Sequence, residues 1–181
     1  MAAAGHEVAC HGWRHEDDWA ELDAGREREL RARAHAALRA PTGFRPPGGE
    51  LTSSSAALLA ELGFTYCSPA GERAGRLGEL AVLPFRWPLI DAYYYLPQFA
   101  GLRRAHGDPE EPMAPAALRD AVLGALDAHV RGDGHLVLLF HPFLLSQGPD
   151  AVAEVLSRVG VLAHAGDVRC LRMDEAAAAV R

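Results

Sequence analysis

The sequence of 181 residues contains no lysine, so all 18 of its basic residues are arginine. Together with the abundance of alanine and glycine, this bias is typical of GC-rich coding and carries no information about chemistry. The 24 acidic residues outnumber the arginines, and the formal net charge is −6. Because binding to nucleic acid requires a concentrated basic face, this balance argues against a nucleic-acid partner.

Cysteine and long apolar runs are also scarce. Cys10, Cys67 and Cys170 are odd in number and far apart, which excludes a readable disulfide framework and a CxxC metal site. The N-terminal stretch MAAAGHEVAC lacks the charged and apolar regions of a signal peptide, and no apolar run has the length of a membrane span. We therefore expect a cytoplasmic protein with no membrane partner, unless an export signal lies upstream in a longer chain.

Several common catalytic motifs are absent as well. The sequence contains no GxGxxG, P-loop, GxSxG or HExxH pattern. Nucleotide binding, serine hydrolysis and zincin chemistry therefore lose their usual signals.

The residues that are present indicate a globular α/β protein. Hydrophobic residues make up 49% of the chain, and no repeat divides it, so we predict one domain over residues 1–181. Apolar runs alternate with helical periodicity, which predicts parallel βαβ units in an open sheet or a barrel. The predicted strands are 7–11, 64–68, 79–85, 135–140 and 167–173, and the predicted helices are 24–40, 52–63, 112–132, 148–160 and 174–181.

The stretch HGWRH places two histidines, His11 and His15, directly after the first predicted strand. Imidazole is a good ligand for zinc and similar ions, and side chains four residues apart can converge if the segment turns helically. Two ligands alone hold a metal poorly. The pair by itself leaves two interpretations open: a metal site, or one histidine that caps a helix and another that is solvated.

Three further polar residues lie next to apolar or rigid segments. Arg45 is the only charge in the loop FRPPGG, Asp91 closes the stretch RWPLID, and His141 ends the apolar part of LLFHPF. Two prolines and two glycines make the first of these loops rigid. Taken singly, each residue also has a structural interpretation, as part of a turn, as a loop acid or as a structural histidine.

Taken in order, these motifs resemble the NodB-homology polysaccharide deacetylases, which are metal-dependent amide hydrolases of the carbohydrate esterase type. GHEVACHGWRHED and FRPPGGELT are similar to the first half of the family pattern. PFRWPLIDAYYYLP and LLFHPF are similar to the second half in its bacterial branch, which includes allantoinase-like and peptidoglycan-deacetylase-like members. The resemblance covers nearly the whole chain and implies an α/β fold, a distorted (β/α) barrel of the NodB-homology type.

The resemblance also implies roles for individual residues. His11 and His15 would be ligands of a divalent metal, with zinc as the expected ion. His141 would be the general acid, Asp91 its partner, and Arg45 would orient the catalytic base. These roles are chemically consistent, because a carboxylate beside an imidazole stabilises the imidazolium that protonates a leaving amine.

The expected substrate-binding residues are Pro47, Gly48 and Trp87. The family usually has an aromatic residue where this chain has Gly48, so part of a substrate platform is missing. This difference and the crowded DAYYYLP loop favour a substrate other than a long glycan.

The family's aspartate pair has no counterpart in this chain. It follows the first strand in a Thr-Phe-Asp-Asp context and supplies the general base and the third metal ligand, whereas only MAAAGHEVAC precedes His11. We therefore expect a chain that lacks the first strands of the barrel and self-associates through the exposed edge. The nearby acids match no family position, and they are candidates for a substitute ligand or for solvated loop residues: Glu7, Glu16, Asp17 and Asp18.

The function implied is that of a metal-dependent hydrolase of C–N amide bonds, an N-deacetylase of an amino sugar or polysaccharide. The alternative substrate is a small cyclic amide, as in the allantoinase-like members. The alternative function is that of a catalytically impaired remnant, which binds metal or serves as an interaction domain.

Overall fold

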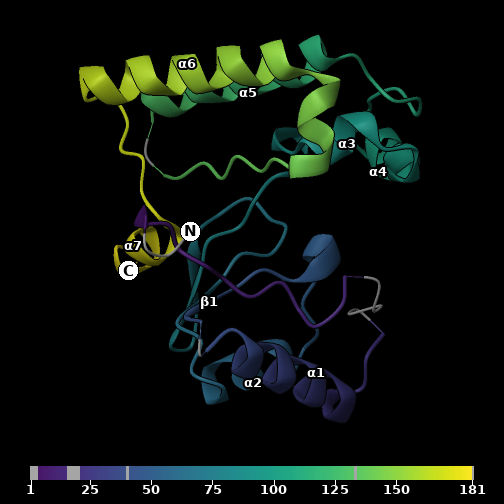
Figure 1. Cartoon of the computed structure of the whole chain (residues 1–181), viewed down its shortest axis with the longest axis vertical. Coiled ribbons are helices and arrows are strands. Elements are labelled where there is room, and N and C mark those ends of the chain that lie inside the picture. The colour runs from purple at the N-terminus through teal and green to yellow at the C-terminus, as the bar shows by residue number, and fades with distance from the viewer. Residues whose placement is uncertain (1–3, 16–20, 40, 133, 181) are drawn as a thin grey trace. The chain divides into compact units, whose positions relative to one another are not determined.

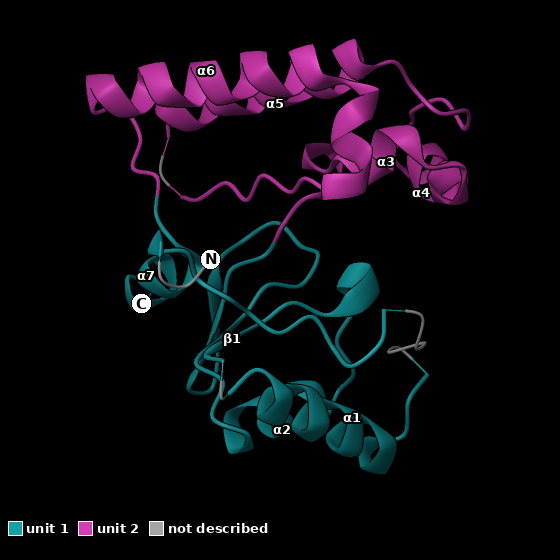
Figure 2. Cartoon of the chain, in the orientation of Figure 1, with its two compact units in different colours: residues 1–84, 171–181 teal, residues 85–170 magenta. Residues whose placement is uncertain are grey.

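The computed structural model describes residues 4–15, 21–39, 41–132 and 134–180. The chain forms two compact units, which Figure 2 shows in different colours. Unit 1 consists of Met1–Pro84 and Leu171–Arg181, and unit 2 consists of Phe85–Cys170. The single domain over residues 1–181 stays a prediction.

Unit 1 contains a short mixed sheet with helices on its faces (Figure 1). Its parallel strands are, in spatial order, β1 (Gly43–Phe44), β2 (Tyr66–Cys67) and β4 (Leu80–Val82), and β3 (Gly75–Leu77) pairs antiparallel with β4. Its helices are α1 (Ala24–Ala37), α2 (Ser55–Glu61) and α7 (Met173–Ala178), with a 3-10 turn η2 (Pro47–Gly49). The predicted α/β class is confirmed.

Successive side chains of the strands enter two different apolar cores. Cys67 and Leu80 pack into a cluster with α1 and α2, whereas Tyr66 and Ala81 pack into a cluster with Ala177 of α7. The side chains of a strand point alternately to opposite faces of the sheet. Strands β2 and β4 therefore each contribute to both layers.

Two of the three cysteines serve this packing. Cys10 and Cys67 are buried and form no disulfide. Burial raises the pKa of both thiols, that of Cys67 to about 12. Because the thiolate is the reactive and metal-binding form, these two residues behave as small apolar groups at neutral pH.

Strand β1 begins with a glycine because the ring of its neighbour occupies the place of a side chain. A Cβ atom on Gly43 would lie 2.0 Å from Cζ of Tyr66, its partner in β2. The Tyr66 hydroxyl in turn donates to the Glu7 carboxylate at 2.6 Å. Any larger residue at position 43 would displace this ring.

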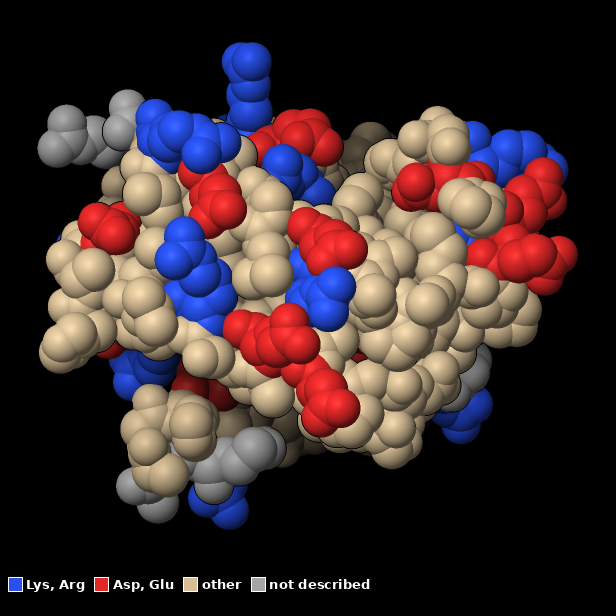
Figure 3. Space-filling view, turned by 90° about the horizontal axis from the view of Figure 1, so that it is seen from above, with Lys and Arg blue, Asp and Glu red and all other residues tan. Residues whose placement is uncertain are grey.

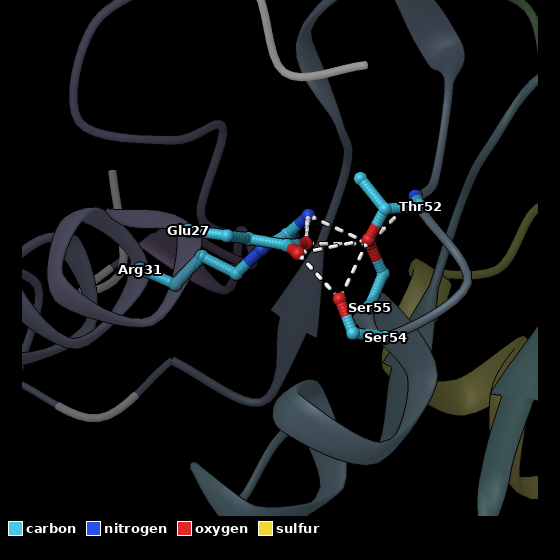
Figure 4. Close-up of polar contacts among 5 residues, drawn as sticks. All are labelled: Glu27, Arg31, Thr52, Ser54 and Ser55. Carbon is cyan, nitrogen blue, oxygen red and sulfur yellow. Dashed lines mark hydrogen bonds and ion pairs between the residues drawn. The ribbon is translucent and has the colours of Figure 1, made fainter. Parts of the chain in front are cut away.

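A buried ion pair joins α1 to the start of α2, as Figure 4 shows. Glu27 and Arg31 are one turn apart on α1, both are 0% exposed, and the guanidinium donates to the carboxylate. The Arg31 guanidinium also lies over the ring of Phe44 in β1, 4.2 Å from its centroid. The Glu27 carboxylate accepts hydrogen bonds from three hydroxyls beside α2, those of Thr52, Ser54 and Ser55.

Unit 2 is helical. It contains α3 (Asp91–Tyr95), α4 (Ala100–His106), α5 (Pro115–Val130) and α6 (Pro149–Ala165), with 3-10 turns η3 (Trp87–Leu89), η4 (Pro97–Phe99) and η5 (Pro142–Gln147). Helices α5 and α6 lie side by side (Figure 1). Ion pairs link Arg119 to Glu154 at 3.5 Å and Asp127 to Arg158 at 2.7 Å. The later residue of α5 thus pairs with the later residue of α6, so the two helices run in the same direction.

The charged residues form no single-sign patch on the face that Figure 3 displays. Arginines and acidic residues are interspersed there among uncharged residues. This mixture agrees with the ion pairs between α5 and α6. Among the described residues, no helix combines the length and the apolar character that a membrane crossing requires.

Three predicted strands are wrong, although all three segments are described. Residues 7–11 contribute only a parallel bridge between Cys10 and Phe44, and residues 135–140 only one between Leu139 and Ile90. Residues 167–173 contain no strand. An apolar run indicates burial, but a strand also needs a neighbour along its length, and of residues 135–140 only Val137 is buried.

The predicted start of α2 is also wrong. The helix begins at Ser55, and its N-cap residue Ser54 makes no side-chain capping bond. The hydroxyls of Thr52 and Ser54 instead donate to Glu27 on α1. These two hydroxyls therefore make a tertiary contact with α1 and no N-terminal cap on α2.

We predict that Glu27→Gln lowers the free energy of unfolding by about 3 kcal/mol, because Arg31 would stay buried without its counter-charge. Glu29→Gln on the same helix is the matched control. Its pair with Arg26 is exposed to solvent, so its loss should cost less than about 0.5 kcal/mol. Urea unfolding at pH 7 measures both changes.

The same substitution has a defined pH dependence. Burial by itself would raise the pKa of Glu27, but hydrogen bonds from Ser55 and Thr52 and the charge of Arg31 lower the pKa on balance. The ionised carboxylate therefore stabilises the fold fully at neutral pH, and this contribution is lost as the pH falls through the lowered pKa. The unfolding free energies of the wild type and Glu27→Gln should converge in acid, and a constant difference would contradict the ion-pair account.

Candidate functional site

In unit 1, the backbone of β1 fixes the position of His11. Cys10 N donates to the Gly43 carbonyl at 2.8 Å, and Arg45 N donates to the Cys10 carbonyl at 2.8 Å. This bridge brings the residue after Cys10 alongside the residue after Phe44. His11 and Arg45, which are 34 positions apart in sequence, therefore lie next to each other.

The contact between them determines the tautomer of His11. Its Nδ1 lies 2.8 Å from the Arg45 carbonyl oxygen. A carbonyl oxygen only accepts, so Nδ1 carries the proton and the lone pair is on Nε2. This arrangement, with one ring nitrogen donating to a backbone carbonyl, is the usual second-shell contact of a metal-binding histidine.

His15 lies beside His11. The centroids of the two rings are 5.1 Å apart and the rings are inclined at 66°. Both residues are exposed, and Gly12 between them has the left-handed φ of 85° that turns the chain. Two adjacent imidazoles fit zinc or a similar divalent ion chemically.

A complete metal-binding set is not found in the described part of the chain. There, no group of three histidine, cysteine, aspartate or glutamate side chains could hold a metal ion. Both oxygens of Glu7 accept hydrogen bonds, from the Tyr66 hydroxyl at 2.6 Å and from Asp174 N at 3.0 Å. The other candidate acids, Glu16, Asp17 and Asp18, lie outside the described residues.

The guanidinium of Arg45 is held by Ser68, a residue that the sequence analysis missed. Nε and Nη2 of Arg45 lie 3.3 Å and 3.1 Å from the Ser68 hydroxyl, and Ser68 is 1% exposed. Burial lowers the pKa of Arg45, and nearby Tyr66 and Glu7 act in the opposite direction. A lone serine after a strand has no motif, so only the pairing of β1 with β2 could have revealed this contact.

The predicted substrate loop at Pro47 and Gly48 forms the 3-10 turn η2. Gly48 has φ of 68°, a left-handed conformation that favours glycine. Gly49 N donates to the Pro46 carbonyl at 3.0 Å, which closes the turn. The rigidity of the loop and its contact with a substrate stay predictions.

In unit 2, three N–H groups converge on the carboxylate of Asp91. The His141 ring donates through Nδ1 to Oδ1 at 2.6 Å, and His141 N donates to Oδ2 at 2.6 Å. Ala92 N, at the start of α3, donates to Oδ1 at 2.7 Å. Asp91 is 1% exposed, whereas the His141 side chain is 29% exposed. The buried carboxylate therefore anchors one edge of a partly exposed imidazole.

The bridge between Ile90 and Leu139 explains this contact between residues 50 positions apart. Asp91 N donates to the Leu139 carbonyl at 3.3 Å, and Leu139 N donates to the Leu89 carbonyl at 3.3 Å. The two segments run parallel, so Asp91 and His141 both follow the paired stretch. The apolar segment 135–140 thus positions His141 although it forms no strand.

Trp87 occupies η3 in the same unit. Its ring contacts Phe85 and Phe99, with centroid separations of 5.3 Å and 5.2 Å. It is half-buried. These contacts describe a packed aromatic group, and its substrate-binding role stays a prediction.

The predicted site residues therefore fall into two sets. His11, His15 and Arg45 come together in unit 1, with the turn at 47–48 in the same unit. Asp91 and His141 come together in unit 2, which also contains Trp87. The first set contains two adjacent imidazoles, which are chemically able to bind a cation. The second contains an imidazole bound to a carboxylate, which is chemically able to transfer a proton.

Comparison with known proteins identifies relatives of the sequence and of the fold. The family model described as polysaccharide deacetylase matches residues 1–67. This range includes His11, His15 and Arg45. A search of curated proteins finds no significant match.

Two solved structures resemble the chain. The crystal structure of a Mycobacterium smegmatis protein, assigned as a polysaccharide deacetylase, has 31% sequence identity and a TM-score of 0.81, and the match covers 99% of this chain and 64% of that one. A family 4 carbohydrate esterase from Streptomyces lividans, in complex with acetate, has 19% identity and a TM-score of 0.49, and covers 91% of this chain and 65% of that one. The second likeness is too low to carry an argument.

The chain spans less than two thirds of the length of the Mycobacterium protein. The family model and that structure agree with the motifs read from the sequence. They confirm the resemblance to the polysaccharide deacetylases of the NodB-homology type.

Proposed function

We propose that this chain contributes the proton-transfer and metal-binding residues of a hydrolase that removes the acyl group from an amide C–N bond. The observation that carries the proposal is the double hydrogen bond from His141 to the buried carboxylate of Asp91. The description of the family as polysaccharide deacetylase supports deacetylation as the reaction. We propose the N-acetyl group of an amino sugar or polysaccharide as its target.

The Asp91–His141 pair fits the role of a general acid. The carboxylate fixes the proton on Nδ1 and stabilises the positive charge of the protonated ring, so the proton available for transfer is on Nε2. Hydrolysis of an amide needs this proton, because an amine leaves readily only when its nitrogen is protonated. The Asp91 hydrogen bond to His141 N also fixes the backbone from which the ring projects.

His11 and His15 are the residues that would hold a divalent metal, with zinc as the proposed ion. When bound, such an ion polarises the acyl carbonyl and lowers the pKa of a water molecule. His11 presents Nε2 to the ion because the Arg45 carbonyl holds its Nδ1 proton. The Ser68 hydroxyl holds the Arg45 side chain, which we assign to orienting the catalytic base.

A metal-binding experiment tests the imidazole pair without reference to catalysis. The wild-type chain should bind Co²⁺ or Zn²⁺, and His11→Ala or His15→Ala should each weaken binding by at least about tenfold, because each removes one ligand. His6→Ala, which alters another exposed histidine of unit 1, is the matched control and should bind like the wild type. Calorimetry and the cobalt absorption spectrum measure both. Equal affinity in all four proteins would contradict the assignment.

The general acid is tested by turnover. In a chain extended to carry the family's aspartate pair, we expect His141→Ala to lower kcat for acetate release from N-acetylglucosamine oligomers by roughly 10²–10⁴-fold and to leave metal affinity unchanged. His164→Ala, an exposed histidine on α6, is the control and should keep full activity. If the extended chain bound metal but released no acetate from sugars or small cyclic amides, that result would instead favour a non-catalytic metal-binding domain.

A further inference from the structure

An exposed phenyl ring lies beside the imidazole of His141. Phe143 is 68% exposed, the highest value among the large apolar side chains in the described residues. Its ring centroid is 5.5 Å from that of His141, and the two rings are tilted by 57°. None of the roles assigned to Asp91 and His141 uses this ring.

The backbone on which Phe143 sits is firmly held. It belongs to η5, in which Pro142 restricts the first φ and Leu144 N donates to the His141 carbonyl at 2.9 Å. Leu144, the next residue, is 2% exposed and anchors the turn in the interior of unit 2. The turn thus buries one apolar side chain and leaves its neighbour in solvent.

Phe143 and Asp91 both contact the imidazole of His141. Asp91 binds the Nδ1 edge of His141, so the rest of the imidazole is the part that a substrate can reach. The phenyl ring contacts this same imidazole. Burying a phenylalanine side chain stabilises a fold, and an exposed ring does not provide this gain to the chain. An exposed ring beside a proton donor, on a backbone held by a hydrogen bond, is suited to contact a ligand instead.

We propose that Phe143 is a substrate-binding residue, whose ring stacks on the C–H face of the sugar ring that carries the acylated nitrogen. The proposal rests on the proposed function and adds to it a residue that selects ring-shaped substrates. Aromatic side chains provide a large, flat apolar surface at low entropic cost, and their electron-rich faces attract polarised C–H groups. A saturated sugar ring presents such groups, so stacking would hold its amide nitrogen beside His141.

The test compares Phe143→Ala with Phe143→Trp, which keeps an aromatic face. Leu156→Ala is the control, because Leu156 is also exposed, at 56%, and lies on α6 of the same unit. Binding of N-acetylglucosamine tetramer is measured by NMR titration, and KM and kcat are measured from acetate release by the same variants of the chain extended to carry the aspartate pair. We expect Phe143→Ala to raise Kd and KM by about tenfold with little change in kcat, and Phe143→Trp and Leu156→Ala to resemble the wild type. N-Methylacetamide, an acetamide without a ring, should be hydrolysed equally by all four proteins.

The outcomes separate this proposal from the proposed function. Sugar binding that depends on the ring at position 143 without any acetate release would overturn the proposed function and leave the stacking role intact. Acetate release with the same KM in Phe143→Ala and the wild type would overturn the stacking role alone. Size-exclusion chromatography provides a further check: if Phe143→Ala abolishes self-association and leaves sugar binding unchanged, the ring serves as a contact between copies and the stacking role is wrong.

Discussion

The proposed chemistry depends on the hydrogen bonds that the Asp91 carboxylate accepts. This carboxylate is buried, yet it accepts hydrogen bonds from two backbone N–H groups and one imidazole N–H. Burying a charge without such partners is costly, so these donors are what allow the acid to sit beneath His141. The same carboxylate holds both the backbone N–H and the ring of His141, so it fixes the ring relative to the main chain.

In unit 1, uncharged groups orient the side chains of the predicted site. The imidazole of His11 is oriented by a backbone carbonyl, and the guanidinium of Arg45 by the hydroxyl of Ser68. Both arrangements depend on the parallel alignment of residues 10, 44 and 67, which brings the ends of three segments to the same edge. The buried Glu27–Arg31 pair packs against this edge, because the Arg31 guanidinium stacks on the ring of Phe44. The arrangement of His11 and Arg45 thus relies on a buried ion pair that packs against β1.

The sequence predicts the long helices well and the short strands poorly. Helix α5 is fixed by the periodicity of its apolar side chains and by Pro115 at its start, so its expected range of 112–132 contains the observed Pro115–Val130. The segments 7–11 and 135–140 are apolar but make only one bridge each, because pairing depends on a neighbouring segment that periodicity does not reveal. The role of Ser68 could not be predicted for the same reason. Ser68 and Arg45 are 23 residues apart in sequence and come together only because β1 pairs with β2. Conversely, the motif order related His141 to Asp91 across 50 residues, which neither spacing nor composition could do.

The burial of Cys10 and Cys67 gives the chain an internal reporter of its own unfolding. Both thiols are inaccessible and protonated in the native core, whereas Cys170 is exposed. A water-soluble maleimide would therefore label one position at once and the other two only when the sheet and helices α1 and α2 separate. The rate of that delayed labelling would follow the opening of the layer that carries His11 and Arg45, with no probe introduced by mutation.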